Sequence, residues 1–286
     1  MSKLQLTPQQ LAYMETFGYL VFPGLLNDRI DRIIEAFEAT FATRGGGHYG
    51  RPHDGLQRSC ILPFIDQTEY LSSLIDDPRV DGIFASLLGE DYTYLGSDGN
   101  YYVGDTNWHS DTDWSGKHRG KPPRLFYKMA LYLDPVNAST GSIRVIPGSY
   151  RYGDRFAEDL QNRLRDPLET LGVTGDQVPA IALSSNPGDV VVFNQATKHS
   201  SWGGSNRRRM FTINATPRYT EAETPLLLNE LGSFAQFWVE GAYGAAMVRT
   251  ASPQRMVHLE QALAQNDFLV EEVKKAKATM SEPSRG

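Results

Sequence analysis

The sequence is poor in cysteine, with Cys60 as the single example among 286 residues. One cysteine excludes an intrachain disulfide and a zinc site built from thiolates. It also fits a reducing compartment, and we expect a cytoplasmic protein. We interpret Cys60, in the run RSCILPF, as core packing rather than a nucleophile, because no charged activator is clearly beside it.

Long apolar runs are missing too. No stretch approaches the roughly 20 residues that are needed to cross a bilayer, and the opening residues MSKLQLTPQQ lack the apolar segment of a secretion signal. The formal net charge is −6, which does not favour a polyanionic partner. We therefore expect neither nucleic acid nor a membrane as partner. The hydrophobic fraction of 40% is enough for a full core.

Helical patterns occupy both ends of the chain. The first helix is predicted in TPQQLAYMETFG, where Thr7 suits the N-cap, Pro8 the first turn and Gly18 the end. No linker or repeat interrupts the sequence, so we expect one domain over residues 1–286. Its predicted parts are a helical lead-in, a β core and a helical tail, at about residues 7–90, 92–219 and 224–278.

The β core is predicted from short apolar segments separated by turn signals such as NASTG and SNPGD. The strand candidates are YTYLG, NYYVG, RLFYKMALYLD, SIRVIPG, VPAIAL, DVVVFN and RMFTINA. Seven or more short strands after a helical lead-in predict a closed or double-sheet β architecture with helices packed outside.

A metal site is indicated by His109 and Asp111. Residues two apart on an extended segment point to the same face, so both side chains can bind one metal. A second histidine would complete a facial triad. His199 is the candidate because it follows the strand DVVVFN, and residues after strand ends often place ligands. The alternatives are a chance His-x-Asp and a surface histidine in a polar loop.

A cluster of three arginines, Arg207, Arg208 and Arg209, opens a strand shortly after His199. An arginine fork is well suited to hold a carboxylate group of a bound small molecule. Only one or two of the three side chains can point inward from a strand. The alternative is a solvated basic edge that discourages strand pairing.

These features, in this order, resemble the phytanoyl-CoA dioxygenase family of Fe(II)/2-oxoglutarate-dependent oxygenases. The resemblance rests on the His-x-Asp, on LYLDPVNASTGSIRVIPGSYR and on GDVVVFNQATKHSSWGGSNRRRMFTI. It implies a double-stranded β-helix (jelly-roll, cupin-like) core and iron bound by His109, Asp111 and His199. It also implies an arginine that binds 2-oxoglutarate, with Arg208 as the best match and Arg209 as the alternative. Further cosubstrate contacts are implied for Thr106 and Arg58.

The resemblance implies oxidation of a small organic molecule at a C–H bond, in natural-product or secondary metabolism. Fe(II), 2-oxoglutarate and O2 are the implied cofactors, with ascorbate as a reductant in vitro. Relatives that halogenate carry a small residue at the position of Asp111, so a carboxylate there favours a hydroxylase over a halogenase. Two other functions stay open, namely a metal-dependent hydrolase and a non-catalytic jelly-roll binding protein.

The segment after Asp111, TDWSGKHRGKPP, is expected to form a lid over the site. We expect contacts to the substrate from two tryptophans and two basic residues, namely Trp108, Trp114, Lys117 and Arg119. The alternative is a solvated loop whose charges face outward. The C-terminal helices are candidates for an oligomer contact.

Overall fold

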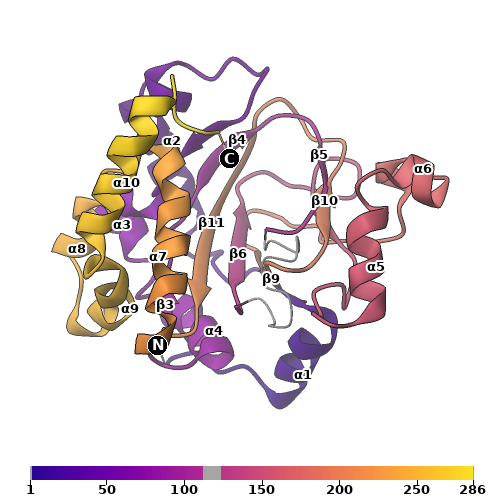
Figure 1. Cartoon of the computed structure of the whole chain (residues 1–286), viewed down its shortest axis with the longest axis horizontal. Helices are drawn as coiled ribbons and strands as arrows, with labels where there is room; N and C mark the ends of the chain where they lie inside the picture. The colour runs from indigo at the N-terminus through magenta and orange to yellow at the C-terminus, as the bar shows by residue number, and fades with distance from the viewer. Residues whose placement is uncertain (1, 112–123, 286) are drawn as a thin grey trace. The chain divides into compact units, whose positions relative to one another are not determined.

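The computed structural model describes residues 2–111 and 124–285. The chain forms two compact units, which are treated separately below. The first unit contains Met1–Gln5, Arg29–Tyr101 and Phe211–Gly286, and the second contains Leu6–Asp28 and Tyr102–Met210. Figure 1 shows the elements of both. The expectation of a single domain stays a prediction.

Two antiparallel sheets make up the second unit. In the larger, β9 (Val190–Asn194) lies between β1 (Tyr19–Phe22) and β6 (Tyr127–Tyr132). The start of β11 (Arg208–Thr216) follows β6, since Leu133 N donates to Arg209 O at 3.0 Å. The smaller sheet has the order β5-β10-β7-β8. Its strands are β5 (Thr106–His109), β10 (His199–Ser201), β7 (Ile143–Val145) and β8 (Ile181–Ala182).

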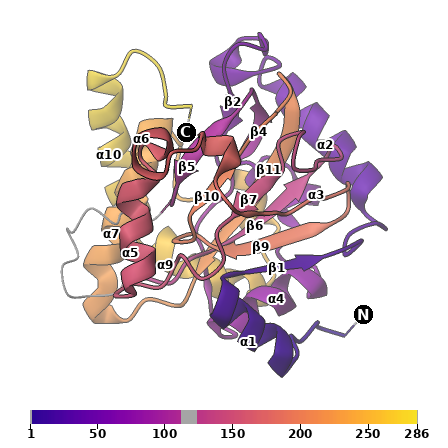
Figure 2. The ribbon, with the colours of Figure 1, turned by 90° about the vertical axis from the view of Figure 1, so that its right-hand side faces the viewer.

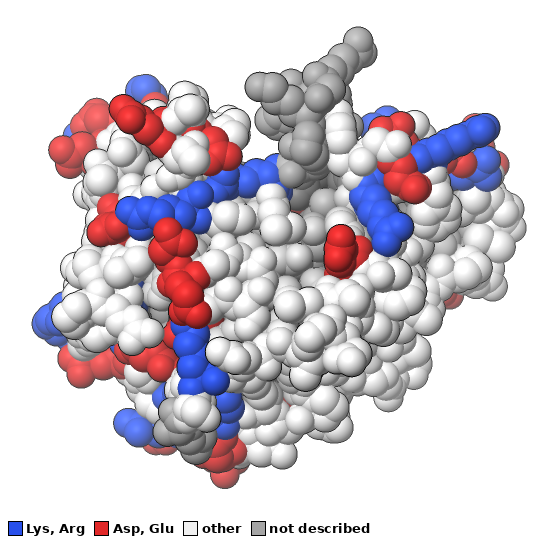
Figure 3. All heavy atoms as spheres, turned by 90° about the horizontal axis from the view of Figure 1, so that it is seen from below, with Lys and Arg blue, Asp and Glu red and all other residues white. Residues whose placement is uncertain are grey.

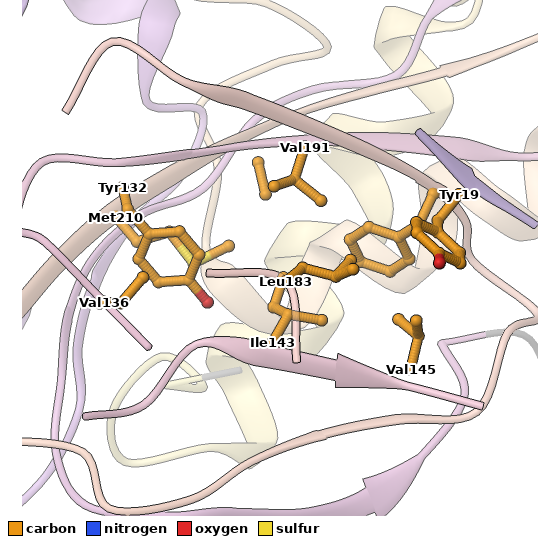
Figure 4. Close-up of a cluster of buried hydrophobic side chains, with 10 residues drawn as sticks. Tyr19, Tyr132, Val136, Ile143, Val145, Leu183, Val191 and Met210 are labelled. Atoms are coloured by element: carbon orange, nitrogen blue, oxygen red, sulfur yellow. The ribbon is translucent and has the colours of Figure 1, made fainter. Parts of the chain in front are cut away.

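Side chains from both sheets of the second unit meet in one apolar core (Figure 4). Val191 and Phe193 come from β9, Val145 from β7 and Met210 from β11, and all are at most 5% exposed. Alternate residues of each strand supply this core, as the two-residue period of a strand requires. The predicted architecture, a mainly β core of antiparallel sheets with flanking helices, is confirmed.

The first predicted helix is also confirmed. Helix α1 (Pro8–Phe17) has Thr7 as N-cap with a capping box, and Gly18 ends it in the left-handed region at φ 83°. A side chain at Gly18 would meet Tyr150, so both the backbone angle and the space require glycine here.

The sequence analysis missed two helices between β7 and β8. They are α5 (Arg155–Arg163), capped by Asp154, and α6 (Pro167–Leu171), capped by Asp166. Leu160, Leu164 and Leu171, from the segment between β7 and β8, pack with Trp108. This helical segment therefore covers one face of the smaller sheet.

The first unit is mostly helical. Its longer helices are α2 (Ile30–Thr43), α4 (Pro78–Leu88), α7 (Thr224–Ser233), α9 (Pro253–Leu263) and α10 (Asn266–Thr279), and its shorter ones are α3 (Glu69–Ser72) and α8 (Ala245–Arg249). Strand β2 (Ser59–Ile61) pairs with β4 (Gly99–Tyr102), and β3 (Thr93–Tyr94) pairs with the end of β11. Within the predicted helical lead-in, the stretch TEYLSSLIDDPRVDGIFASLLG contains two separate helices, α3 and α4.

Helix α2 illustrates how the first unit is held together. Phe37 and Phe41 lie one turn apart on its buried face, and their rings contact Phe64 and Tyr101. Cys60 is buried in β2, as expected for a packing residue. None of the described helices has the length and apolar composition that a membrane span requires.

Figure 3 shows one face of the molecule. Lys and Arg side chains are interspersed there with Asp and Glu among the residues that the structure describes. The view from the side in Figure 2 places β1 next to β9, and β10 among the strands of the smaller sheet.

Candidate metal centre

Strand pairing in the second unit brings the two histidines together. His109 ends β5 and His199 begins β10, and the two residues are direct partners in the antiparallel register. Asp111 lies two residues beyond His109, and its backbone N donates to Gln195 O at 3.0 Å. His199 therefore belongs to a strand and is buried, so the alternative of a surface histidine in a polar loop is wrong.

The three side chains converge. Asp111 Oδ1 lies 3.7 Å from His109 Nε2, and Asp111 Oδ2 lies 3.8 Å from His199 Nε2. One ligand atom from each residue can be chosen so that all lie within 4.8 Å of one another. The exposed fraction of the side chain is 41% for His109, 23% for Asp111 and 8% for His199. The group is thus open to solvent on the His109 side.

Both imidazoles are oriented by the backbone. His109 Nδ1 lies 2.8 Å from Asn107 O, and His199 Nδ1 lies 2.8 Å from Thr197 O. A carbonyl oxygen only accepts, so each Nδ1 carries the proton and donates it. Each Nε2 then offers its lone pair toward Asp111. This arrangement of a carbonyl behind each histidine is typical of metal ligands.

The charges of the group also suit a divalent metal. Burial, followed by repulsion from His109, lowers the pKa of His199 to about 3, so this imidazole is neutral at neutral pH. Burial raises the pKa of Asp111, but the attraction of Lys128 and then of the two histidines holds that pKa below its usual range. Two neutral nitrogens and one carboxylate are the donor set of non-haem Fe(II) sites.

Lys128, on β6, is a residue of this centre that the sequence analysis missed. Its Nζ lies 2.8 Å from Asp111 Oδ2, and its side chain is 18% exposed. The sequence offered one signal for it. Lys128 shares a face of the apolar strand with Ala130 and Tyr132, which both belong to the core, so the pattern indicates a charged residue that points inward.

Strand alternation places Arg208 and Arg209 on opposite faces of β11. Arg208 shares the inward face of β11 with the core residue Met210, and it is 3% exposed. Its Nη1 reaches Gly104 O at 3.4 Å, and its Cζ lies 5.4 Å from the centre of the Tyr102 ring. Its Nε has no hydrogen-bond partner in the part of the chain that the structure describes.

Two glycines make the space for Arg208. A Cβ at Gly141 or at Gly204 would overlap its guanidinium group. Gly141 also has φ 90°, so both its backbone and its surroundings require glycine. The fold therefore encloses a cation without giving it a carboxylate from the described residues.

Arg209 points the other way and is already paired. Its Nε lies 3.0 Å from Asp134 Oδ1, and its backbone N donates to Asp134 Oδ2 at 2.8 Å. Arg209 Nη2 donates further to Leu133 O at 3.2 Å. The guanidinium group of Arg209 is thus already bound to the carboxylate of Asp134.

Two further predicted contact residues, Trp108 and Thr106, belong to β5 together with His109. Trp108 directly precedes His109 and so points to the opposite face of the strand. Thr106 is the register partner of Ser201 across a register shift, and its contact with the cosubstrate stays a prediction.

Trp108 is 7% exposed and packs against Leu160 of α5 and the neighbouring Leu164. Its Nε1 donates to Gly175 O at 2.8 Å. This environment is that of a packing residue, and the expected contact of Trp108 with the substrate stays a prediction.

Arg58 belongs to the first unit, where it donates to Asn100 Oδ1 at 2.8 Å and pairs with Asp98 at 3.2 Å. These contacts give its charge a carboxylate partner. The three remaining substrate candidates, and the predicted lid around them, lie outside the described residues; they are Trp114, Lys117 and Arg119.

The sequence profile of the family described as phytanoyl-CoA dioxygenase (PhyH) matches residues 14–211. The chain belongs to this family. The match extends from α1 to the start of β11 and includes all three candidate metal ligands and Arg208. No curated protein sequence matches the chain closely enough to add to this assignment. The family match gives no support to the hydrolase or to the binding-protein alternative.

Solved structures share the fold of this family member. HygX from Streptomyces hygroscopicus, with nickel and 2-oxoglutarate bound, has a TM-score of 0.59 at 17% identity, over 76% of this chain and 89% of that one. The carbocyclase SnoK from nogalamycin biosynthesis has a TM-score of 0.57 at 20% identity, over 76% and 86%. EctD from S. alaskensis has 0.56 at 21%, over 74% and 77%. The predicted jelly-roll fold is confirmed.

Proposed function

We propose that this protein is an oxygenase that binds Fe(II) through His109, Asp111 and His199 and oxidises a C–H bond of a small organic molecule. The observation that carries the proposal is the convergence of two backbone-oriented imidazoles and one carboxylate. Three protein ligands leave open coordination positions on a six-coordinate metal. When bound there, iron with 2-oxoglutarate and O2 supplies the oxidising chemistry.

Arg208 is our proposed ligand for the distal carboxylate of 2-oxoglutarate. It is a buried cation with an unsatisfied Nε, in the same unit as the metal ligands. Burying a charge is costly unless it is paired, so a buried guanidinium without a carboxylate calls for an anionic ligand. Arg209 does not meet this description, because Asp134 already satisfies it.

We further propose hydroxylation, or another oxidation at carbon, over halogenation. Asp111 places a carboxylate within the group of metal ligands, and a halide would need that space. The structural relatives include a carbocyclase and a structure with 2-oxoglutarate and 5-hydroxyectoine, so one fold serves several outcomes on small molecules. The same limit applies to the substrate, which we propose only as a small organic molecule.

The chain's own residues have defined tasks in this reaction. His109 and His199 hold their protons on Nδ1 and present Nε2 to the metal. Arg208 orients the cosubstrate by a charge-assisted contact. The ring of Phe193 packs against that of His199 in a T-shaped arrangement, with ring centres 5.0 Å apart, and shields it from water on the core side.

Release of succinate tests the proposal. We expect the Fe(II)-loaded protein with ascorbate to form succinate from 2-oxoglutarate in air and none under nitrogen, since O2 is consumed in the reaction. Zinc in place of iron should give no succinate. A candidate substrate should raise the rate and yield one oxidised product for each succinate. Hydrolysis of a substrate by the zinc form without O2 would instead support the hydrolase.

A further inference from the structure

Lys128 lies in the metal centre, at a position of β6 where packing alone would favour an apolar side chain. It lies at one end of the inward-facing row formed by Lys128, Ala130 and Tyr132 on β6. Its register partner on β9 is Phe193, a member of the same apolar core. The apolar row would favour an apolar side chain at this position, yet the strand presents an ammonium group 2.8 Å from Asp111 Oδ2.

The contact distinguishes between two otherwise similar oxygens. Asp111 Oδ1 is 3.7 Å from His109 Nε2, and Oδ2 is 3.8 Å from His199 Nε2. The histidines therefore do not decide whether one or both oxygens bind a metal. The ion pair with Lys128 does, because it holds Oδ2 and leaves Oδ1 without a cationic partner among the residues that the structure describes.

We propose that Lys128 is a positioning residue that keeps Asp111 a one-oxygen ligand and offsets the charge of the bound cosubstrate. The inference rests on the proposed function. A carboxylate that bound through both oxygens would take one of the positions that the cosubstrate and O2 need. An outer contact that orients a metal ligand is a general device of metal sites.

The charges of the site lead to a specific expectation. A divalent metal with two neutral histidines and one aspartate carries one net positive charge. Dianionic 2-oxoglutarate adds two negative charges, of which Arg208 is proposed to offset one, and the ammonium group of Lys128 places a second positive charge beside Asp111. Lys128 therefore opposes the metal alone, by repulsion between like charges, and favours the metal together with the dianion.

The test separates these two binding steps. Lys128→Met should bind Mn(II), measured by calorimetry, as tightly as the unaltered protein or several-fold more tightly. The same variant loaded with Fe(II) without oxygen should bind 2-oxoglutarate about tenfold more weakly or worse, as measured by the visible charge-transfer absorption of the chelate. Lys128→Arg keeps the charge and a donor, and it should restore 2-oxoglutarate binding to within about threefold.

Lys274→Met is the matched control, since it removes an exposed lysine that pairs with Glu271. It should leave both affinities unchanged. Equal 2-oxoglutarate binding by Lys128→Met and the unaltered protein would overturn the inference. A parallel loss of metal and cosubstrate binding with a lower melting temperature would also overturn it, by showing a merely structural role. An unaltered protein that binds Mn(II) but never 2-oxoglutarate would instead refute the proposed function, and this inference with it.

Discussion

His199→Ala and Asp111→Ala should each abolish 2-oxoglutarate turnover, with loss of at least about a hundredfold in Fe(II) affinity for the aspartate variant. The reason is that three donors act on one ion, so removing one leaves a two-point site that holds metal poorly. His109→Ala should behave in the same way. Calorimetry with Mn(II) and succinate release with Fe(II) measure the two effects.

The fold should survive these changes. His109 and Asp111 are partly exposed, and each histidine contributes a single backbone contact through Nδ1. Asp159→Asn is the matched control, because Asp159 is an exposed carboxylate of the same unit that pairs with Arg163. It should retain metal binding and turnover. Turnover within a few-fold of the unaltered protein for any of the three alanine variants would remove that residue from the metal centre.

Local sequence signals were sufficient for much of the fold. Helix α1 carries its N-cap, its proline and its terminal glycine within twelve residues, and the apolar runs of β6 and β9 are bounded by turn residues. Two kinds of element escaped. Strands β2, β5 and β10 are only three or four residues long, and β5 and β10 contain few apolar side chains, so the strands depend on their tertiary partners.

The helices α5 and α6 escaped for a different reason. Their sequence RFAEDLQNRLRDPLETL is rich in charge, and most of it stays exposed, so it lacks a broad apolar face. Their capping residues, Asp154 and Asp166, were the usable signals. Each lies directly before the helix, and Asp166 is followed by proline.

The metal ligands could be chosen from sequence because spacing and strand period constrain them locally. Lys128 could not be placed beside Asp111 from sequence, since the pairing depends on how β6 lies with respect to the segment after β5. The choice between Arg208 and Arg209, in contrast, could be predicted from the sequence. Met210 is apolar and had to face the core, so alternation puts Arg208 inward and Arg209 outward.

Arg208→Met should weaken 2-oxoglutarate binding by about ten- to a hundredfold, because a charge-assisted contact contributes about 1.5–3 kcal/mol. Methionine has a similar length and is apolar, so it fits the space bounded by Gly141 and Gly204 better than alanine would fill it. Affinity for Mn(II) alone should not change, since Arg208 makes no contact with the metal ligands that the structure records. Titration of the Fe(II) protein with 2-oxoglutarate in the absence of oxygen measures the effect.

The same variant should be more stable than the unaltered protein when no ligand is present. Arg208 is a buried cation whose Nε is unsatisfied, and replacing such a charge by an apolar side chain often stabilises a fold. Arg209→Met is the control with the opposite pattern. It breaks the fork with Asp134 and should lower the melting temperature slightly while leaving cosubstrate binding intact. If Arg209→Met lost 2-oxoglutarate binding and Arg208→Met kept it, Arg208 would not be the cosubstrate ligand, and its burial would need another explanation.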